Sequence, residues 1–200
     1  MKKLSLIALL IATQSFAAKV GDLAPQFSGV DALSNKEIKL SDLTKKDAKH
    51  TGYTVVEWYN KDCPFVKKHY GPGNMQKLQK EWTAKGVNWV TVNSSAEGKQ
   101  GNVNAAQAKE DLTQKGAAPT AFLIDDKGTI GKLYGAETTP HMFIISPEGK
   151  LVYNGAIDDN TTLDAKENTK NYISQALSEA LAGKKISVAS SKPYGCGVKY

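Results

Sequence analysis

Residues 57–66 read EWYNKDCPFV and place one cysteine, Cys63, at the boundary between two local patterns. Before it, residues 53–59 (YTVVEWY) are β-branched and aromatic, which predicts a strand covered on both faces. After it, Pro64 suits the first turn of a helix, where its missing N–H has no intrahelical partner to bond. The stretch therefore predicts a strand, a short loop and a helix that begins beside Cys63.

A cysteine at the start of a helix is favoured as a thiolate. The partial positive charge of the helix end and the free N–H groups of its first turn both stabilise a negative sulfur. Lys67 and Lys68 add to this effect if they face the sulfur, whereas Asp62 opposes it. We expect a lowered thiol pKa and a nucleophilic Cys63.

The first residues have the pattern of a secretory signal peptide. Lys2 and Lys3 precede an apolar run, residues 4–12, which is too short to span a bilayer. Small residues follow, and we expect cleavage after Ala17, which leaves residues 18–200 as one domain. An uncleaved anchor is the competing interpretation. The sequence predicts an exported, periplasmic protein without stable membrane insertion.

The charged residues are biased in type. The formal net charge is +6, and all 26 basic residues are lysine, because the chain contains no arginine. The basic excess is spread along the chain rather than gathered in one run, which argues against a nucleic-acid partner. Bidentate recognition of oxyanions normally falls to a guanidinium, which this chain lacks. We expect no cofactor.

The order of predicted elements indicates an α/β fold. An N-terminal hairpin is expected from residues 27–30 and 37–40. Strands and helices then alternate, which favours parallel pairing with crossover helices, before two antiparallel strands around a Pro-Glu-Gly turn. The later strands are expected at 53–59, 87–92, 121–124 and within 141–157, and the helices at 64–70, 74–86 with Asn74 as the cap, 105–115 and 168–182. Residues 93–104 are expected to form a polar loop without regular structure, and residues 183–200 a tail.

Two cysteines, Cys63 and Cys196, occur in a chain expected in a compartment where disulfides persist. One interpretation is a permanent structural bridge. Closing a loop of this length would contribute about 4 to 5 kcal/mol by the chain-entropy estimate. The other interpretation is a redox-active pair.

A second motif precedes a predicted strand. Thr138-Thr139-Pro140 leads directly into HMFII. The proline suits a turn with a cis peptide bond, in which backbone groups reach a neighbouring site, or an ordinary strand-initiating proline.

These residues resemble the thioredoxin-fold proteins, and more closely their peroxiredoxin-like, or redoxin, branch. VVEWYNKDCPFV resembles the strand-loop-helix of that fold, with Glu57 as the acid six residues before the reactive cysteine, and Thr139-Pro140 resembles its cis-proline loop. CPFVK, YGAETTPHMFIISPEGKLVYNGAIDD and the terminal PYGCGVKY resemble the redoxin branch, and the likeness spans residues 21–200. It implies a central mixed sheet flanked by helices, with an N-terminal hairpin extension.

Departures from better-known relatives bear on mechanism. Val66 stands where thioredoxins and disulfide isomerases carry their second cysteine. Val56 and Asn60 stand where peroxiredoxins carry the proline and the threonine or serine that help to position a peroxide, and the peroxiredoxin arginine is missing. The resemblance therefore favours thiol–disulfide exchange, with a thiol peroxidase as the alternative.

The resulting hypothesis assigns a role to each candidate residue. Cys63 attacks a disulfide or a peroxide, and Cys196 resolves the product in the manner of an atypical two-cysteine redoxin. Glu57 accepts or donates a proton, its pKa raised by burial. The residues expected to position the substrate are Pro64, Asn60, Thr139 and Pro140. The expected partners are a thiol-containing protein or a peroxide and an external thiol reductant.

A copper-binding or copper-delivery protein is a further alternative. The candidate ligands are Cys63, His69 and His141, while His50 is expected in solvent. His69 lies nearly two helical turns after Cys63, which is poor geometry for joint ligation. His141 follows the proline loop and is better placed.

Overall fold

The computed structural model of the chain describes residues 18–164, 166 and 168–200. The expected signal peptide lies outside these residues. Within the described ranges, no helix has the length and apolar character needed to cross a membrane.

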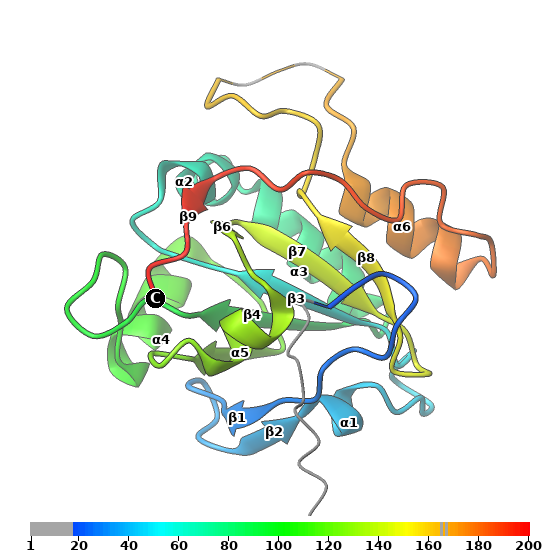
Figure 1. Cartoon of the computed structure of the whole chain (residues 1–200), viewed down its shortest axis with the longest axis horizontal. Coiled ribbons are helices and arrows are strands. Elements are labelled where there is room, and N and C mark those ends of the chain that lie inside the picture. Colours follow the sequence, from blue (N-terminus) through cyan, green and yellow to red (C-terminus); the bar gives the residue numbers. More distant parts are fainter. Residues whose placement is uncertain (1–17, 165, 167) are drawn as a thin grey trace, which may run out of the picture.

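A five-stranded mixed sheet forms the centre of the molecule, with the strand order β5-β4-β3-β7-β8 (Figure 1). The central strand β3 (Thr54–Trp58) runs parallel to β4 (Asn88–Asn93), which runs parallel to β5 (Ala121–Ile124). On the other side of β3, β7 (His141–Ile145) and β8 (Leu151–Gly155) continue the sheet by antiparallel pairing. The parallel pairs and the final antiparallel pair confirm the predicted thioredoxin-like arrangement.

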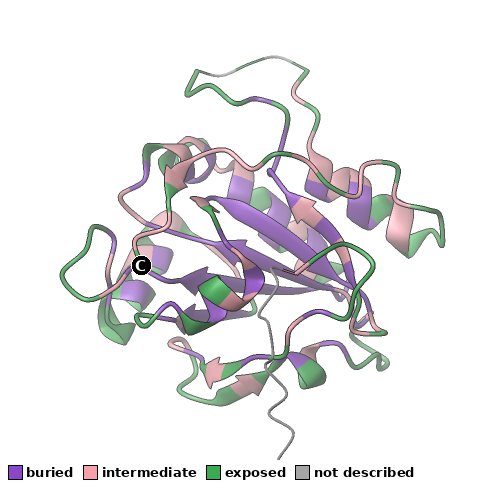
Figure 2. Cartoon of the chain, viewed as in Figure 1, coloured by how far each residue is buried: buried purple, intermediate pink, exposed green. Residues whose placement is uncertain are grey.

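Both faces of the sheet are covered, which explains why β3 has no exposed residue (Figure 2). Val55 belongs to the core on one face and Val56 to the core on the other, as strand alternation requires. The first face packs against α2 (Pro64–Tyr70), α3 (Asn74–Ala84), α4 (Ala105–Lys115) and α6 (Tyr172–Leu181). The second face packs against α1 (Leu40–Leu43), α5 (Thr129–Tyr134) and the hairpin of β1 (Ser28–Val30) and β2 (Glu37–Lys39).

The helices differ from the sequence prediction both in their boundaries and in their number. Gly73, in the left-handed region at φ 83°, is the N-cap of α3, and Asn74 is the first helical residue. Helix α6 begins later than expected, because Asn168 has a positive φ of 55° and the Asn171 side chain caps the helix by accepting the Ser174 N–H at 2.8 Å. The short helices α1 and α5 were not predicted.

Segment 93–104 is a loop without regular structure after Asn93, as predicted, and fixed contacts hold it in place. Asn93 ends β4, and Ser94 and Ser95 are buried. The Asn93 side chain donates to the Gly101 carbonyl at 2.8 Å, and the Asn102 side chain donates to the Ser95 carbonyl at 2.8 Å. These bonds fold the segment back on itself beside the end of β3.

The C-terminal tail runs back from α6 across the molecule to the side of α2 (Figure 1). Near its end it forms a two-residue strand, β9 (Cys196–Gly197), which pairs antiparallel with β6 (Thr138–Thr139) just before β7. In this register Cys196 lies opposite Thr139. A segment 57 residues away in sequence thereby lies against the proline loop.

Candidate functional site

Cys63 and Cys196 are joined by a disulfide, with their Cα atoms 6.0 Å apart. Cys63 is the N-cap of α2, in extended conformation, and Pro64 occupies the first turn as the sequence predicted. Cys63 is fully buried, whereas Cys196 is half-buried. The tail therefore lies over the N-terminal end of α2 and shields Cys63 from solvent.

The Thr139–Pro140 peptide bond is cis, which confirms the first interpretation of this motif. Its carbonyl side faces the disulfide: the Thr139 oxygen lies 3.1 Å from the Cys63 Sγ. The Thr139 hydroxyl lies 3.5 Å from the Cys196 carbonyl oxygen. Cys63, Cys196, Thr139 and Pro140 thus meet at one point, and their roles toward a substrate stay predictions.

Charged residues around Cys63 are largely paired with other groups. Asp62 accepts from Lys61 Nζ at 2.9 Å, and this interaction lowers the pKa of the Asp62 carboxyl. Lys68 donates to the Asn160 carbonyl and lies near the Tyr194 hydroxyl, so its contacts are with the β8–α6 loop and the tail. The opposing charge that the sequence indicated at Asp62 is therefore partly neutralised.

Glu57 is fully buried and serves as the acceptor for four donors. Its Oε1 accepts from the Tyr70 hydroxyl at 2.8 Å. Its Oε2 accepts from Trp89 Nε1 at 2.8 Å and, more weakly, from Gln79 Nε2 and Thr91 Oγ1, each at 3.3 Å. Burial raises the pKa of Glu57, while the four hydrogen bonds oppose that shift.

No hydrogen bond joins Glu57 to Cys63 within the described ranges. The Glu57 carboxylate instead ties β3 to β4, α2 and α3. Its predicted role as a proton acceptor or donor therefore stays a prediction, and any proton transfer to Cys63 requires intervening groups or water.

Asn60 is also fully buried, and its amide is used within the protein. The amide nitrogen donates to the Gln100 carbonyl at 3.0 Å and lies 3.4 Å from the Ser95 hydroxyl, while the amide oxygen accepts the Asp62 N–H at 2.9 Å. In this conformation Asn60 fastens the loop before Cys63 to segment 93–104, and its predicted contact with substrate remains untested.

The two buried histidines are separately satisfied. His69 Nε2 lies 3.0 Å from the Tyr194 hydroxyl and Nδ1 lies 2.9 Å from the Asn74 amide nitrogen. His141 Nδ1 accepts the Glu137 N–H at 3.2 Å and Nε2 bonds to the Asn154 side-chain oxygen at 2.7 Å. Burial lowers the pKa of each to about 4. Among the described residues, no group of three or more acidic, cysteine or histidine side chains is arranged to hold a metal.

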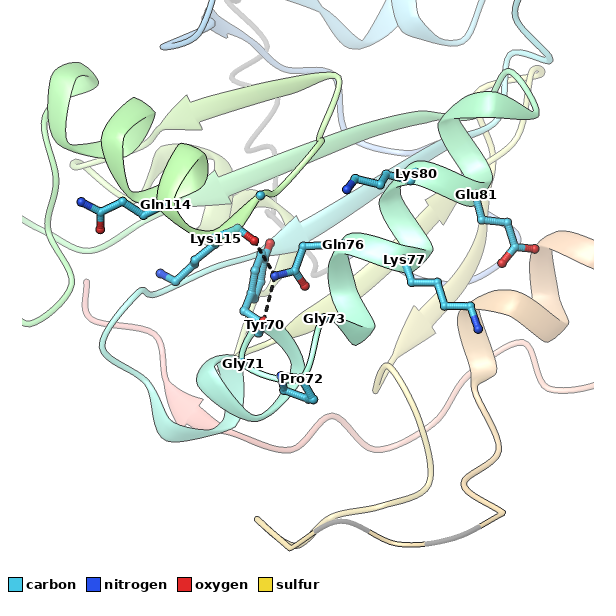
Figure 3. Close-up of a pocket in the computed structure, with 11 residues that line it drawn as sticks. Tyr70, Gly71, Pro72, Gly73, Gln76, Lys77, Lys80, Glu81, Gln114 and Lys115 are labelled. Carbon is cyan, nitrogen blue, oxygen red and sulfur yellow. Dashed lines mark hydrogen bonds between the residues drawn. The ribbon is translucent and has the colours of Figure 1, made fainter.

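A separate groove of about 1030 Å³ lies where α2, α3 and the end of α4 meet (Figure 3). Gln76 lies at its base and donates to two helix-end carbonyls, those of Tyr70 and Lys115. The Lys115 ammonium is already paired with Asp111 and with the Tyr59 hydroxyl. Neither cysteine lines this groove, so it is distinct from the disulfide site.

A thioredoxin-like sheet with a helix-capping cysteine beside a cis-proline loop defines a class of thiol-based redox proteins. The sequence profile of the AhpC/TSA family matches residues 20–154, and the chain belongs to that family. It is therefore an oxidoreductase that acts on thiols and disulfides or on peroxides. A search of curated proteins found no match.

Solved structures support the same fold. The chain is similar to an uncharacterised conserved protein from Geobacillus kaustophilus, with 27% identity, a TM-score of 0.79 and coverage of 91% of this chain and 92% of that one. A hypothetical protein from Sinorhizobium meliloti has 23% identity, a TM-score of 0.79 and coverage of 92% and 96%. A protein described as thiol:disulfide interchange protein DsbE, from Chlorobium tepidum, has 26% identity, a TM-score of 0.53 and coverage of 69% and 85%.

Sequence reasoning missed the residues that hold the tail. Tyr194, two residues before Cys196, bonds to Asp158 and to His69. An aromatic residue inside the PYGCGVKY motif was the available signal, but its partners lie 36 and 125 positions away.

Proposed function

We propose that this chain is an exported thiol–disulfide oxidoreductase in which Cys63 and Cys196 are the redox-active pair. The observation that carries the proposal is the disulfide between a helix-capping cysteine and a half-buried cysteine of the tail, beside the cis Thr139–Pro140 bond. Membership of the AhpC/TSA family and the likeness to a described thiol:disulfide interchange protein support it.

In the reducing direction, the Cys63 thiolate attacks a partner disulfide. One partner sulfur leaves as a thiolate, and a mixed disulfide links Cys63 to the partner. The Cys196 thiolate then attacks the Cys63 sulfur, which releases the second partner thiolate and forms the Cys63–Cys196 disulfide. The partner gains two electrons, the chain loses two, and the two cysteine protons pass to solvent or to the partner thiolates.

Regeneration uses an external thiol. The half-buried Cys196 is the more accessible sulfur, so the incoming thiolate attacks Cys196 and Cys63 leaves as a thiolate. A second thiolate of the reductant then attacks the reductant's own sulfur in this mixed disulfide, so that Cys196 leaves as a thiolate and the reductant becomes a disulfide.

Turnover with a protein disulfide tests this function. Wild-type protein with an external thiol should reduce a disulfide-containing protein such as insulin, and Cys63→Ser should abolish the activity. Cys196→Ser should accumulate a mixed disulfide at Cys63. Retained activity in Cys63→Ser would refute the proposal, and a reduction potential well below about −300 mV would identify a structural bridge instead.

Peroxide reduction is the second candidate, because membership of the AhpC/TSA family supports a peroxide substrate as well as a disulfide. The chain contains no arginine to polarise a peroxide. We therefore expect Cys63 in the Cys196→Ser protein to react with hydrogen peroxide at a rate near that of free cysteine. Stopped-flow oxidation measures this rate, and a much faster reaction would identify the peroxidase.

Export depends on the first 17 residues. Their charged, apolar and small-residue pattern supports secretion, cleavage after Ala17 and a periplasmic location. Cell fractionation with N-terminal sequencing of the mature protein tests this part of the proposal.

A further inference from the structure

Tyr194 fastens the tail to the same helix that begins at Cys63. Its ring meets Phe65 edge-on, with the centroids 5.8 Å apart, and Lys68 Nζ lies 4.9 Å from its centroid. Phe65, Lys68 and His69 are spaced so that they share one face of α2. The tail is therefore anchored across that face two residues before Cys196.

The Tyr194 hydroxyl is held by charged and polar groups. It donates to Asp158, a residue that is only 5% exposed and whose Oδ1 also accepts the Asn160 N–H at 3.1 Å. It lies 3.0 Å from His69 Nε2, and His69 Nδ1 faces the Asn74 amide. With the Tyr194 hydrogen directed to Asp158, His69 Nε2 is the donor to the Tyr194 oxygen. Loss of the hydroxyl would leave a buried carboxylate short of a donor, which is costly.

The hydrogen bonds on the other side of Cys196 join neutral groups, although Lys132 Nζ lies 5.5 Å from the centroid of the Tyr200 ring. The Val198 N–H donates to the Glu137 carbonyl at 3.1 Å, and the Ala96 N–H donates to the Lys199 carbonyl at 2.8 Å. The Tyr200 hydroxyl donates to the Ala136 carbonyl at 2.9 Å. The tail is thus held on both sides of Cys196 by contacts that do not need the disulfide itself.

We propose that Tyr194 is the positioning residue that sets the docked fraction of the reduced tail, and so the effective concentration of Cys196 at Cys63. Only a docked tail brings the two thiols close enough for intramolecular attack, so that concentration is proportional to the docked fraction. Hydrogen bonds to charged groups stabilise more than neutral ones, so Tyr194 contributes more than Tyr200. The inference rests on the proposed exchange between the two cysteines.

Equilibration of the full-length protein with glutathione buffers tests the inference. Oxidised glutathione converts the two thiols to the Cys63–Cys196 disulfide and yields two reduced glutathione molecules. When half of the protein is oxidised, the squared concentration of reduced glutathione divided by the concentration of oxidised glutathione gives the effective concentration. Tyr194→Phe should lower it about tenfold or more. Tyr200→Phe, which removes a hydroxyl from the other side of Cys196, should change it less than about threefold. An unchanged value in Tyr194→Phe, or equal losses in the two variants, would overturn the inference.

Hydrogen exchange of the reduced proteins gives a second readout. Amides of residues 194–198 should exchange faster in reduced Tyr194→Phe than in reduced wild type, while the strands of the central sheet remain equally protected. Faster exchange throughout the sheet would instead indicate general destabilisation and contradict a positioning role. Both measurements remain possible if no protein disulfide is exchanged, so failure of the proposed function is distinguishable from failure of this inference.

Discussion

Tyr70 on α2 donates a 2.8 Å hydrogen bond to Glu57 on β3, so the helix that begins at Cys63 is tied at its far end to a buried carboxyl of the central strand. Burial raises the pKa of Glu57, and this bond is one of those that oppose the rise. The stability contributed by a group with a raised folded pKa is present below its unfolded pKa and is lost as the pH rises through the folded value.

Tyr70→Phe should therefore destabilise the fold in a pH-dependent manner. Removal of the hydroxyl takes a donor from the charged form of Glu57, so the pKa of Glu57 rises further and the cost grows as the pH rises above the ordinary value of 4.5. We expect a loss of about 1 to 3 kcal/mol at pH 8. Urea denaturation between pH 5 and pH 8 measures it.

Tyr134→Phe is a matched control. The buried Tyr134 hydroxyl donates to the Pro25 carbonyl at 2.8 Å, and that acceptor does not titrate. The loss of folding stability in Tyr134→Phe should be nearly constant with pH. A constant loss in Tyr70→Phe as well would contradict the assigned environment of Glu57.

Acid should destabilise the fold through its buried histidines. Burial lowers the pKa of His141 to about 4 from an ordinary value of 6.5. The unfolded chain therefore binds the proton first, and the stability that neutral His141 contributes above pH 6.5 is lost as the pH falls toward 4. The expected loss is about 2 kcal/mol between pH 7.5 and pH 5, with a similar contribution from His69.

His141→Gln should reduce the slope of folding stability against pH, between pH 7.5 and pH 5, by roughly half, because Gln does not titrate and His69 remains. The variant is expected to be less stable than wild type at pH 7.5, since the bonds to Glu137 and Asn154 are disturbed. Denaturant midpoints at pH 7.5, 6 and 5 measure the slope. A slope equal to that of wild type would show that His141 does not take part.

Local patterns were sufficient to predict most of the sheet and the position of Cys63. VNWVTV is rich in β-branched and aromatic residues and AFLI is apolar, and in this order of elements both favour short strands buried on both faces. The capping box of α4, formed by Asn104 and Gln107, likewise lies within a few residues of the helix that it starts.

Features that depend on distant segments were not predictable. Asn168 and Asn171 are both good caps by residue type, and only the backbone of the preceding loop selects Asn171. Strands β6 and β9 have two residues each, which is too short for an alternation of polar and apolar residues to be seen in the sequence. The contacts of Tyr194 likewise depend on the docked position of the tail, which no local pattern specifies.

Segment 93–104 supports the loop before Cys63, and Gly101 is the point of closest approach. Gly101 has φ +82°, and a Cβ there would lie 2.1 Å from the Asn60 side-chain oxygen. Gly101→Ala should therefore displace Asn60, whose carbonyl accepts the Cys63 N–H at 3.1 Å. We expect a destabilisation of at least about 2 kcal/mol and slower thiol exchange at Cys63.

Gly98→Ala separates the steric effect from the backbone effect. Gly98 has φ +74°, but a Cβ there would meet nothing within 4 Å. Gly98→Ala should therefore destabilise the fold only by the strain of an alanine in the left-handed conformation, about 1 kcal/mol, and leave thiol exchange at Cys63 unchanged. Equal behaviour of the two variants in denaturation and in thiol exchange would exclude contact with Asn60 as the cause.

The direction of attack on the disulfide follows from burial. Cys63 is fully buried and Cys196 half-buried, so a small thiolate reaches Cys196 first, and Cys63 at the helix end is the better leaving group. Brief exposure of the oxidised protein to reduced glutathione, followed by acid quenching and alkylation, should give glutathione on Cys196 and the alkyl group on Cys63.

Peptide mass spectrometry assigns the two labels in this experiment.

Gly195→Ala displaces the tail, because a Cβ at Gly195 would lie 2.1 Å from the Thr139 carbonyl oxygen and the tail must shift. Cys63 should then become accessible, and the adduct should divide between the two cysteines. Glutathione found mainly on Cys63 in the wild-type protein would mean that the tail opens before the thiolate attacks, and that burial in the docked form does not decide which sulfur reacts.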